Sequence, residues 1–318
     1  MKRMFKWGWL FLVVGVIFLA IGAFAHGAKD VVFNGWKPVV YSNKANYQHS
    51  YSTEAFKQVD VTVGNANVVI RRGDNYGVKY HGRKSARPRV KVLNGRLVVR
   101  QKGTNLVRKN FLGFHWSGDE YRVSNKLTVY IPDNVKLNRI RNLNNRGTTV
   151  IEGVSTGYLE AIGSLGLLNL RNVNVDNTNI EVRDDADIRL EDSTILGGLI
   201  TGDNCDVVAQ NGTLRGVELQ QSDGDITMRN VSLDGGKANV TDGDVKITDS
   251  TVTNGYSLIN NDGNNTLTNV KAGGYDLTAN ANSHNDLFGN HQKSGSLHSG
   301  TATNVLTIFN TDGDNTVR

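Results

Sequence analysis

The 318-residue sequence is poor in cysteine and proline. It contains one cysteine, Cys205, so an internal disulfide is excluded and stability must come from packing. Only 3 prolines occur, against 35 glycines, and 38% of the residues are apolar. This composition, with its many Gly, Asn, Asp and Thr residues, is typical of short strands joined by tight turns.

Acidic residues are scarce in the first half of the chain. Residues 1–147 contain 26 Lys/Arg and 7 Asp/Glu, a balance of +19, whereas residues 148–318 contain 10 and 23, a balance of −13. The formal net charge of +6 therefore conceals one basic and one acidic half. A balance of +19 exceeds what solubility needs, so we consider an anionic partner, with a merely soluble basic face as the alternative.

Charged residues are absent from one long run near the N-terminus, residues 7–25, which follows Lys2, Arg3 and Lys6. A helix of this length spans roughly 28 Å, close to the hydrocarbon thickness of a bilayer. The positive-inside rule keeps the basic end in the cytoplasm. We therefore predict a single-pass anchor in residues 1–28, in the cell membrane, with the C-terminal part extracytoplasmic. The alternative is a cleaved signal peptide, because Ala23-Phe24-Ala25 resembles a cleavage site.

A ten-residue block recurs from Asn145 onward. Its copies are separated by 19, 20, 19, 19, 19 and 20 residues, and they start at positions 145, 164, 184, 203, 222, 241 and 261. The fifth and seventh positions are mostly apolar, as in Ile226 and Met228, and they point the same way because strand side chains alternate. Two further apolar columns follow in each period. Three short strands per 19–20-residue coil predict an all-β parallel β-solenoid, with coils about 4.8 Å apart.

Two polar or small columns have structural interpretations. The third position always carries a small residue, Cys205 among them, so we interpret it as a crowded corner and not as a redox site. The ninth position is Asn or Asp in every copy from Asn172 to Asn269. Such side chains bond their own turn backbone and stack on the next coil. The block restarts at Thr311, which predicts a partial final coil.

The part of the chain before the repeat has a different pattern. Residues 56–142 contain strand-like stretches that form either the first, wider turns of the solenoid or a β-cap on its end. Asn94-Gly95 between two alternating runs predicts a hairpin. Residues 29–55 have weak structure signals and are assigned to a polar stalk, and residues 143–318 to the solenoid repeats.

The strand motifs of this region resemble those of a bacterial family. They are Phe56-x-x-Val59-x-Val61, Ala66–Ile70 with Gly73-Asp74, Gly95–Val99, Leu127–Pro132 and Ile140 to Gly147. Over roughly residues 1–280 the chain resembles the "putative adhesin" domain of unknown function. The resemblance implies a short N-terminal anchor, β-strand repeats and an envelope-associated surface protein, in some members linked to envelope stress. It implies no catalytic residues.

Two groups of residues are candidates for contact with a partner. An insertion at residues 106–125 mixes basic and aromatic side chains, and its Phe111, Phe114 and Trp116 either contact an envelope surface or plug the open solenoid end. A basic stretch has the charge to bind teichoic acid or anionic lipid. It consists of Arg71, Arg72, Lys79, Arg83, Lys84, Arg87, Arg89 and Lys91. We expect no nucleic-acid partner outside the cell.

Metal and catalytic sites are weakly indicated. The Asp-Gly-Asp corners, such as Asp223 to Asp225, offer oxygen ligands for calcium, but tight turns explain them equally well. Stacked coils would place carboxyl groups at glycosidase spacing by default, so no pair is singled out. His284, His291 and His298 fall in a Ser/Gly/Asn-rich tail that we expect to be a loose loop. We predict no metal, no cofactor and no catalytic residue.

The leading interpretation is a non-catalytic, membrane-anchored scaffold or adhesin that contacts anionic envelope polymers or another envelope protein. One alternative is a polysaccharide-acting enzyme on a β-helix, and another is a regulatory partner of a membrane sensor. A cleft with unmatched acids would favour the enzyme, whereas an evenly laddered surface would favour the scaffold.

Overall fold

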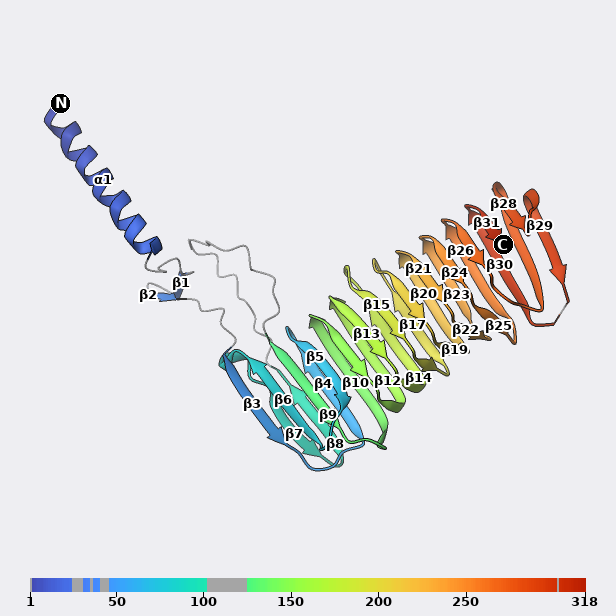
Figure 1. The fold of residues 1–318 in the computed structure, drawn as a ribbon, viewed down its shortest axis with the longest axis horizontal. Coiled ribbons are helices and arrows are strands. Elements are labelled where there is room, and N and C mark those ends of the chain that lie inside the picture. Colours follow the sequence, from blue (N-terminus) through green and yellow to red (C-terminus); the bar gives the residue numbers. More distant parts are fainter. Residues whose placement is uncertain (1, 25–30, 35–36, 41–45, 102–124, 302) are drawn as a thin grey trace. The chain divides into compact units, whose positions relative to one another are not determined.

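The structure is a computed structural model that describes residues 2–24, 31–34, 37–40, 46–101, 125–301 and 303–318. The chain forms two compact units, residues 1–44 with 105–122, and residues 45–104 with 123–318. In the first unit, α1 (Lys2–Phe24) is followed by β1 (Val31–Asn34), which pairs antiparallel with β2 (Lys37–Val40) (Figure 1). Within the described ranges, no helix combines the length and apolar character needed to cross a membrane.

The second unit is all-β and contains a parallel stack of coils with three sides, which we call A, B and C (Figure 1). Residues at the fifth block position pair in register from Thr149 through Leu168 and Ile188 onward, so the predicted offsets of 19 and 20 residues are confirmed. Each coil thereby hydrogen-bonds to the next along all of its strands.

The sides differ in strand length. Side A contains β10 (Lys136–Arg146), β12 (Ser155–Leu165), β14 (Asn174–Val182), β17 (Gly198–Gly202), β20 (Val217–Asp223), β23 (Lys237–Asp242) and β26 (Tyr256–Asp262). Side B contains β11 (Thr149–Glu152), β13 (Leu167–Arg171), β15 (Asp187–Glu191), β18 (Val207–Gln210), β21 (Ile226–Arg229), β24 (Val245–Thr248) and β27 (Asn265–Thr268). Side C contains β16 (Thr194–Ile195), β19 (Thr213–Arg215), β22 (Ser232–Asp234), β25 (Thr251–Thr253) and the first residues of β10, β12 and β14.

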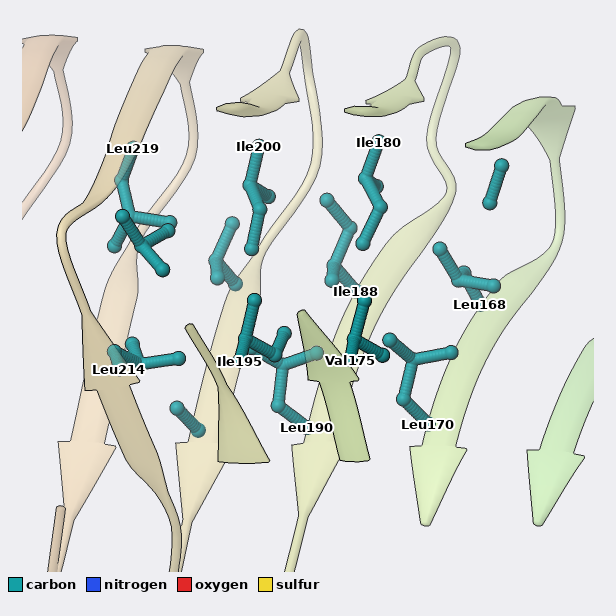
Figure 2. Packing of buried hydrophobic residues seen from close by; sticks show 14 of the residues in the cluster. Leu168, Leu170, Val175, Ile180, Ile188, Leu190, Ile195, Ile200, Leu214 and Leu219 are labelled. Atoms are coloured by element: carbon teal, nitrogen blue, oxygen red, sulfur yellow. The ribbon is translucent and has the colours of Figure 1, made fainter. Parts of the chain in front are cut away.

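All three sides contribute apolar columns to one core. Figure 2 shows Leu190 of side B, Ile195 of side C and Ile200 of side A in one coil, with side chains directed to the interior. The next coil repeats the arrangement with Leu214 and Leu219. Full burial of each aliphatic side chain stabilises the fold by about 1.5–3 kcal/mol, so the alternation seen in the sequence supplies the main driving force for stacking.

The corners between the sides explain the small and Asx columns. At the A–B corner, a Cβ added to Gly166 would lie 2.6 Å from the carbonyl oxygen of Gly147 in the neighbouring coil. At the B–C corner the ninth-position residues, Asn172 to Asn269, adopt φ of 50–54°. Asn and Asp tolerate this left-handed conformation better than other non-glycine residues. Asn230 Nδ2 also donates to Asn211 Oδ1 of the adjacent coil at 3.0 Å, as the stacking interpretation predicted.

At the N-terminal end, the order of coils in space differs from the order in sequence. β4 (Gln58–Val63) and β5 (Asn67–Arg72) stack directly on β10 and β11, whereas β8 (Arg96–Arg100) and β9 (Lys126–Ile131) form the next coil outward. Antiparallel strands finish this end. They are β6 (Gly77–Gly82) on β9, β3 (Tyr47–Ser52) on β6, and β7 (Arg89–Leu93) on β8, with the short 3-10 helix Lys84–Ala86 between β6 and β7.

The C-terminal end is inverted in the same way. β30 (Val305–Asp312) and β31 (Asn315–Val317) lie between β26/β27 and β28 (Gly274–Leu287), which pairs antiparallel with β29 (Asn290–Gly300). The expectation of a loose loop around His284, His291 and His298 is therefore wrong. These residues lie in the two strands of a hairpin whose backbone groups are paired. Their own side chains are exposed, while Leu277 and Leu287 of the same hairpin are buried in the core.

Candidate functional site

The N-terminal end of the solenoid has a one-sided charge. Residues 77–101 contain no Asp or Glu, and their eight basic residues are Lys79, Arg83, Lys84, Arg87, Arg89, Lys91, Arg96 and Arg100. The β7–β8 hairpin predicted from Asn94-Gly95 is present, and it brings several of these side chains onto the outer surface of side A.

We call Arg89, Lys91, Arg96 and Arg100 the A-face basic patch. Arg89 pairs directly with Arg100 across the hairpin. On β8, Leu97 and Val99 are buried, so the alternate residues Arg96 and Arg100 point outward. In the described part of the chain, no carboxylate lies at ion-pair distance from Arg89, Lys91 or Arg96. Like charges that lie close together without counterions favour the approach of a polyanion.

An ionic network borders this patch on the following coils. Asp60 binds Arg100 at 2.6 Å and Arg141 at 3.5 Å, and Glu160 joins Arg141 at 3.3 Å to Arg139. Burial by itself would raise the pKa of Asp60, but hydrogen bonds and attraction from Arg100 and Arg141 outweigh it and hold that pKa below its usual value. Three arginines thus share two carboxylates, so the network adds to the positive potential.

The structure divides the basic residues chosen from the sequence among several places. Arg89 and Lys91 lie on side A. Arg71 and Lys79 lie on side B, where Arg71 contacts the Tyr130 ring and Lys79 pairs with Thr128. Lys84 and Arg87 lie on the segment that links β6 to β7, and Arg83 is half-buried before it. These side chains therefore do not form one continuous site.

Arg72 has a structural role. Its guanidinium donates to the carbonyl oxygens of Gly153 at 2.7 Å, Pro132 at 2.8 Å and Val135 at 2.9 Å. These bonds fix turns of neighbouring coils, so few of its donors remain for an external anion.

Sequence reasoning missed Arg96, Arg100, Arg139 and Arg141 as surface neighbours of Arg89. The hairpin signal at Asn94-Gly95 already implied that Arg89 and Arg100 share a face, and it was the signal that could have found them. Arg139 and Arg141 join only because β10 stacks on β4, which local sequence does not reveal.

A row of aromatic side chains lies on β3. Tyr47, His49 and Tyr51 alternate with exposed residues and are half-buried; His49 meets Tyr51 edge to face at 4.4 Å, and Tyr47 stacks on His49 at 6.1 Å. We call this row, together with Arg87, the aromatic platform. Arg87 lies over the Tyr51 ring at 5.5 Å, and its Nε donates to Tyr51 Oη at 2.9 Å.

The Asp-Gly-Asp corners use their second aspartate to join coils. Asp225 N donates to Asp206 Oδ1 at 3.0 Å, Asp244 N to Asp225 Oδ1 at 2.9 Å, and Asn264 N to Asp244 Oδ1 at 2.7 Å. The hydrogen bonds between these aspartates and the backbone of the next coil explain why the corners carry aspartate. Among the residues described, no three His, Cys, Asp or Glu side chains are grouped to hold a metal ion.

A shallow polar groove follows the B–C corner, where Asp192, Asn211, Asn230 and Asp249 alternate with Thr and Ser. Asp192 and Asp249 are three coils apart, or about 14 Å at the spacing of neighbouring strands. The two glycosidase geometries require carboxyl groups roughly 5–9.5 Å apart.

Phe111, Phe114 and Trp116, the other predicted contact residues, lie outside the described residues.

These features define a β-strand-repeat protein whose surface is laddered and whose N-terminal end is basic. The chain belongs to the Toastrack DUF4097 family, whose sequence model matches residues 56–318. The resemblance noted from the strand motifs is thus confirmed at the level of a family defined by a domain of unknown function. No curated protein matches the chain.

Three solved structures are similar to the chain. One, from Bacteroides fragilis, is described as a "putative adhesin" (13% identity, TM-score 0.40, covering 85% of this chain and 96% of that chain). Another, from Clostridium sporogenes, is described as a "putative cell adhesion protein" (11%, 0.23, 85% and 98%). A third, from Parabacteroides distasonis, is described as a "Putative lipid binding protein" (10%, 0.36, 87% and 98%).

Proposed function

We propose that this protein is a non-catalytic binding scaffold on the outer side of a bacterial cytoplasmic membrane. Its basic end engages anionic envelope polymers such as teichoic acid. The observation that carries the proposal is the A-face basic patch, in which Arg89, Lys91 and Arg96 are exposed without a carboxylate partner in the described structure.

A polyanion gains from this arrangement because several cations act on it together. Two unit charges 4 Å apart interact by about 1 kcal/mol in water, and screening leaves neighbours within ~8 Å effective at physiological salt. The adjacent network of Arg139 and Arg141 extends the positive surface along side A over the following coils. A single phosphate would be held weakly, whereas a chain of phosphates can contact successive coils.

The acidic residues of the repeat support a scaffold more than an enzyme. The second aspartates of the corners accept backbone N–H groups of the next coil, as Asp225 and Asp244 do. The two carboxylates of the polar groove, Asp192 and Asp249, stand farther apart than either glycosidase mechanism uses.

The location rests on the sequence, where three basic residues precede the uncharged run 7–25. The anchor remains a prediction. Protease treatment of intact spheroplasts expressing the full chain is the test. We expect the repeat region to be digested while the chain remains in the membrane fraction. Protection of the repeats, or their release into the soluble fraction without cleavage, would contradict the proposed location.

Binding is tested with the full chain in detergent and cell walls prepared with and without teichoic acid. We expect walls with teichoic acid to bind more protein, with binding that weakens as salt rises. The variant R89S/K91S/R96S should lose at least about tenfold in affinity, since each removed charge contributes several tenths of a kcal/mol or more. Equal binding to both wall preparations would rule out the anionic-polymer proposal.

A matched control removes three exposed cations elsewhere. Arg229, Lys246 and Lys271 are exposed on later coils, and R229S/K246S/K271S lowers the net charge by the same amount. We expect this control to bind like the wild type within about twofold, because the lost charges lie farther from the patch than a Debye length. Equal losses in both variants would mean that net charge, and not the patch, governs binding.

A further inference from the structure

We infer that the aromatic platform is a binding site for a sugar ring that carries a negative charge. The inference deepens the proposed function, because it names an anionic glycan as the polymer class that this end of the solenoid recognises.

The platform presents partly exposed aromatic side chains from an edge strand. Tyr47, His49 and Tyr51 project from one face of β3, and among the described strands β3 pairs only with β6. All three rings keep part of their surface open to solvent. The negative face of an aromatic ring attracts the weakly positive C–H groups of a sugar, a contact that a bare phosphate chain cannot make.

The rings are held in place from the neighbouring strand. Tyr80 of β6 lies directly opposite His49, is fully buried, and has its ring 6.3 Å from that of Tyr47. Its hydroxyl donates to Arg83 O at 2.8 Å and contacts Asn125 Oδ1 at 2.9 Å. Burial raises the pKa of Tyr80 to about 12, so this hydroxyl stays protonated and the support stays neutral at physiological pH. A rigid platform loses less entropy when a ligand binds.

Arg87 supplies the charge that selects an anion. Tyr51 Oη donates to Pro88 O at 2.9 Å and accepts from Arg87 Nε, which holds the guanidinium over the Tyr51 ring. A second guanidinium nitrogen lies 3.4 Å from His49 Nε2. In the described part of the chain Arg87 has no carboxylate partner, so N–H donors remain for a carboxylate or phosphate.

Charge complementarity favours an anionic ligand over a neutral sugar. Exposed Lys84 lies three residues from Arg87, and the segment that carries both is free of Asp and Glu. An acidic sugar bound here would stack on the rings while its anionic group pairs with Arg87. The rest of the glycan could continue toward the A-face basic patch, because Arg89 begins β7 two residues after Arg87.

Two soluble probes separate stacking from charge. Tetragalacturonate has four sugar rings with carboxylates, whereas tetrapolyphosphate has charge without rings. Titration calorimetry with the full chain in detergent measures the affinity of wild type and variants for each. We expect Y47S/H49S to lower the affinity for tetragalacturonate about tenfold, because the aromatic contacts are lost. Its affinity for tetrapolyphosphate should stay within about twofold of the wild-type value. Retained tetrapolyphosphate binding also shows that the variant is folded.

Y158S is the matched control. Tyr158 also lies under an arginine, Arg139, at 5.3 Å, but has no place in the aromatic row. We expect Y158S to bind both probes like the wild type. If wild type does not bind tetragalacturonate, if Y47S/H49S keeps wild-type affinity for it, or if Y47S/H49S loses both probes equally, the inference is overturned.

The same experiment distinguishes failure of the sugar platform from failure of the proposed polyanion binding. Loss of both probes in R89S/K91S/R96S, with no selective effect of Y47S/H49S, would keep the polyanion proposal and discard the sugar platform. If the wild type binds neither probe, neither stands.

Discussion

The A–B corner allows a sharp test of the solenoid. Gly166 has φ of 128°, and a Cβ built on it would lie 2.6 Å from Gly147 O and 2.7 Å from Gly147 C. Both contacts are to backbone, which cannot move without separating two coils. Gly216 also has positive φ, 58°, but an added Cβ would meet nothing within 4 Å. The pair compares a crowded corner in a conformation reserved for glycine with an open position in the milder left-handed conformation.

The expected magnitudes follow from these two environments. Gly216→Ala places alanine in the left-handed region, which lowers the free energy of unfolding by about 1–2 kcal/mol. In Gly166→Ala the alanine must adopt a conformation that is essentially reserved for glycine, which lowers the free energy of unfolding by about 1–3 kcal/mol. Overpacking of the corner lowers it by about 1–3 kcal/mol more. We therefore expect Gly166→Ala to be more destabilising by at least about 1 kcal/mol, and by more if the coils cannot separate.

Hydrogen exchange is the suitable assay because repeat arrays can unfold in part. The backbone N–H of Gly147 donates to Leu165 O at 2.8 Å beside the substituted corner. Its protection should fall in Gly166→Ala and remain unchanged in Gly216→Ala, while urea unfolding reports the global difference. Equal destabilisation by the two substitutions, or unchanged protection at Gly147, would refute the crowded-corner interpretation.

Three further outcomes are expected. Arg72→Met should lower the free energy of unfolding by about 2–4 kcal/mol, because three backbone carbonyls lose a charged donor, whereas Arg71→Met should cost less than about 1 kcal/mol in the same urea titration. Burial raises the pKa of Cys205 to about 11, so the thiol ionises first in the unfolded chain, and the free energy of unfolding should fall between about pH 9 and 11. Alkylation of the native protein at pH 8 should be slow. Cys205→Ala, which resembles Ala186 one coil earlier, should remove that pH dependence. Deleting residues 305–318 should expose edges of β26 and β28 and cause association in size-exclusion chromatography, and a monomeric, fully folded product would contradict the inserted order of strands.

The candidate site was only partly predictable. The sequence indicated that the basic residues before the repeat matter, and Arg89 and Lys91 do share a surface. The aromatic platform was not foreseen, because Tyr47 to Ser52 fell in the range assigned to a stalk, although its aromatic residues alternate with polar ones. It becomes a strand by pairing with β6, whose Val78 and Tyr80 are buried.

The sequence by itself determined the repeat, since each of its signals is local. Alternation of inward residues, small residues at the A–B corner and Asx residues at the B–C corner recur every 19 or 20 positions, and each is imposed by the chain conformation at that point. Only the tertiary structure decided how the ends are assembled. β4/β5 lie between two coils that both come later in the sequence, and β30/β31 lie between strands that both come earlier. Equivalent strands have equivalent hydrogen-bonding edges, so only long-range packing selects among these orders. That choice brings Arg100, Asp60 and Arg141 together, and the antiparallel strands beyond it carry the aromatic platform.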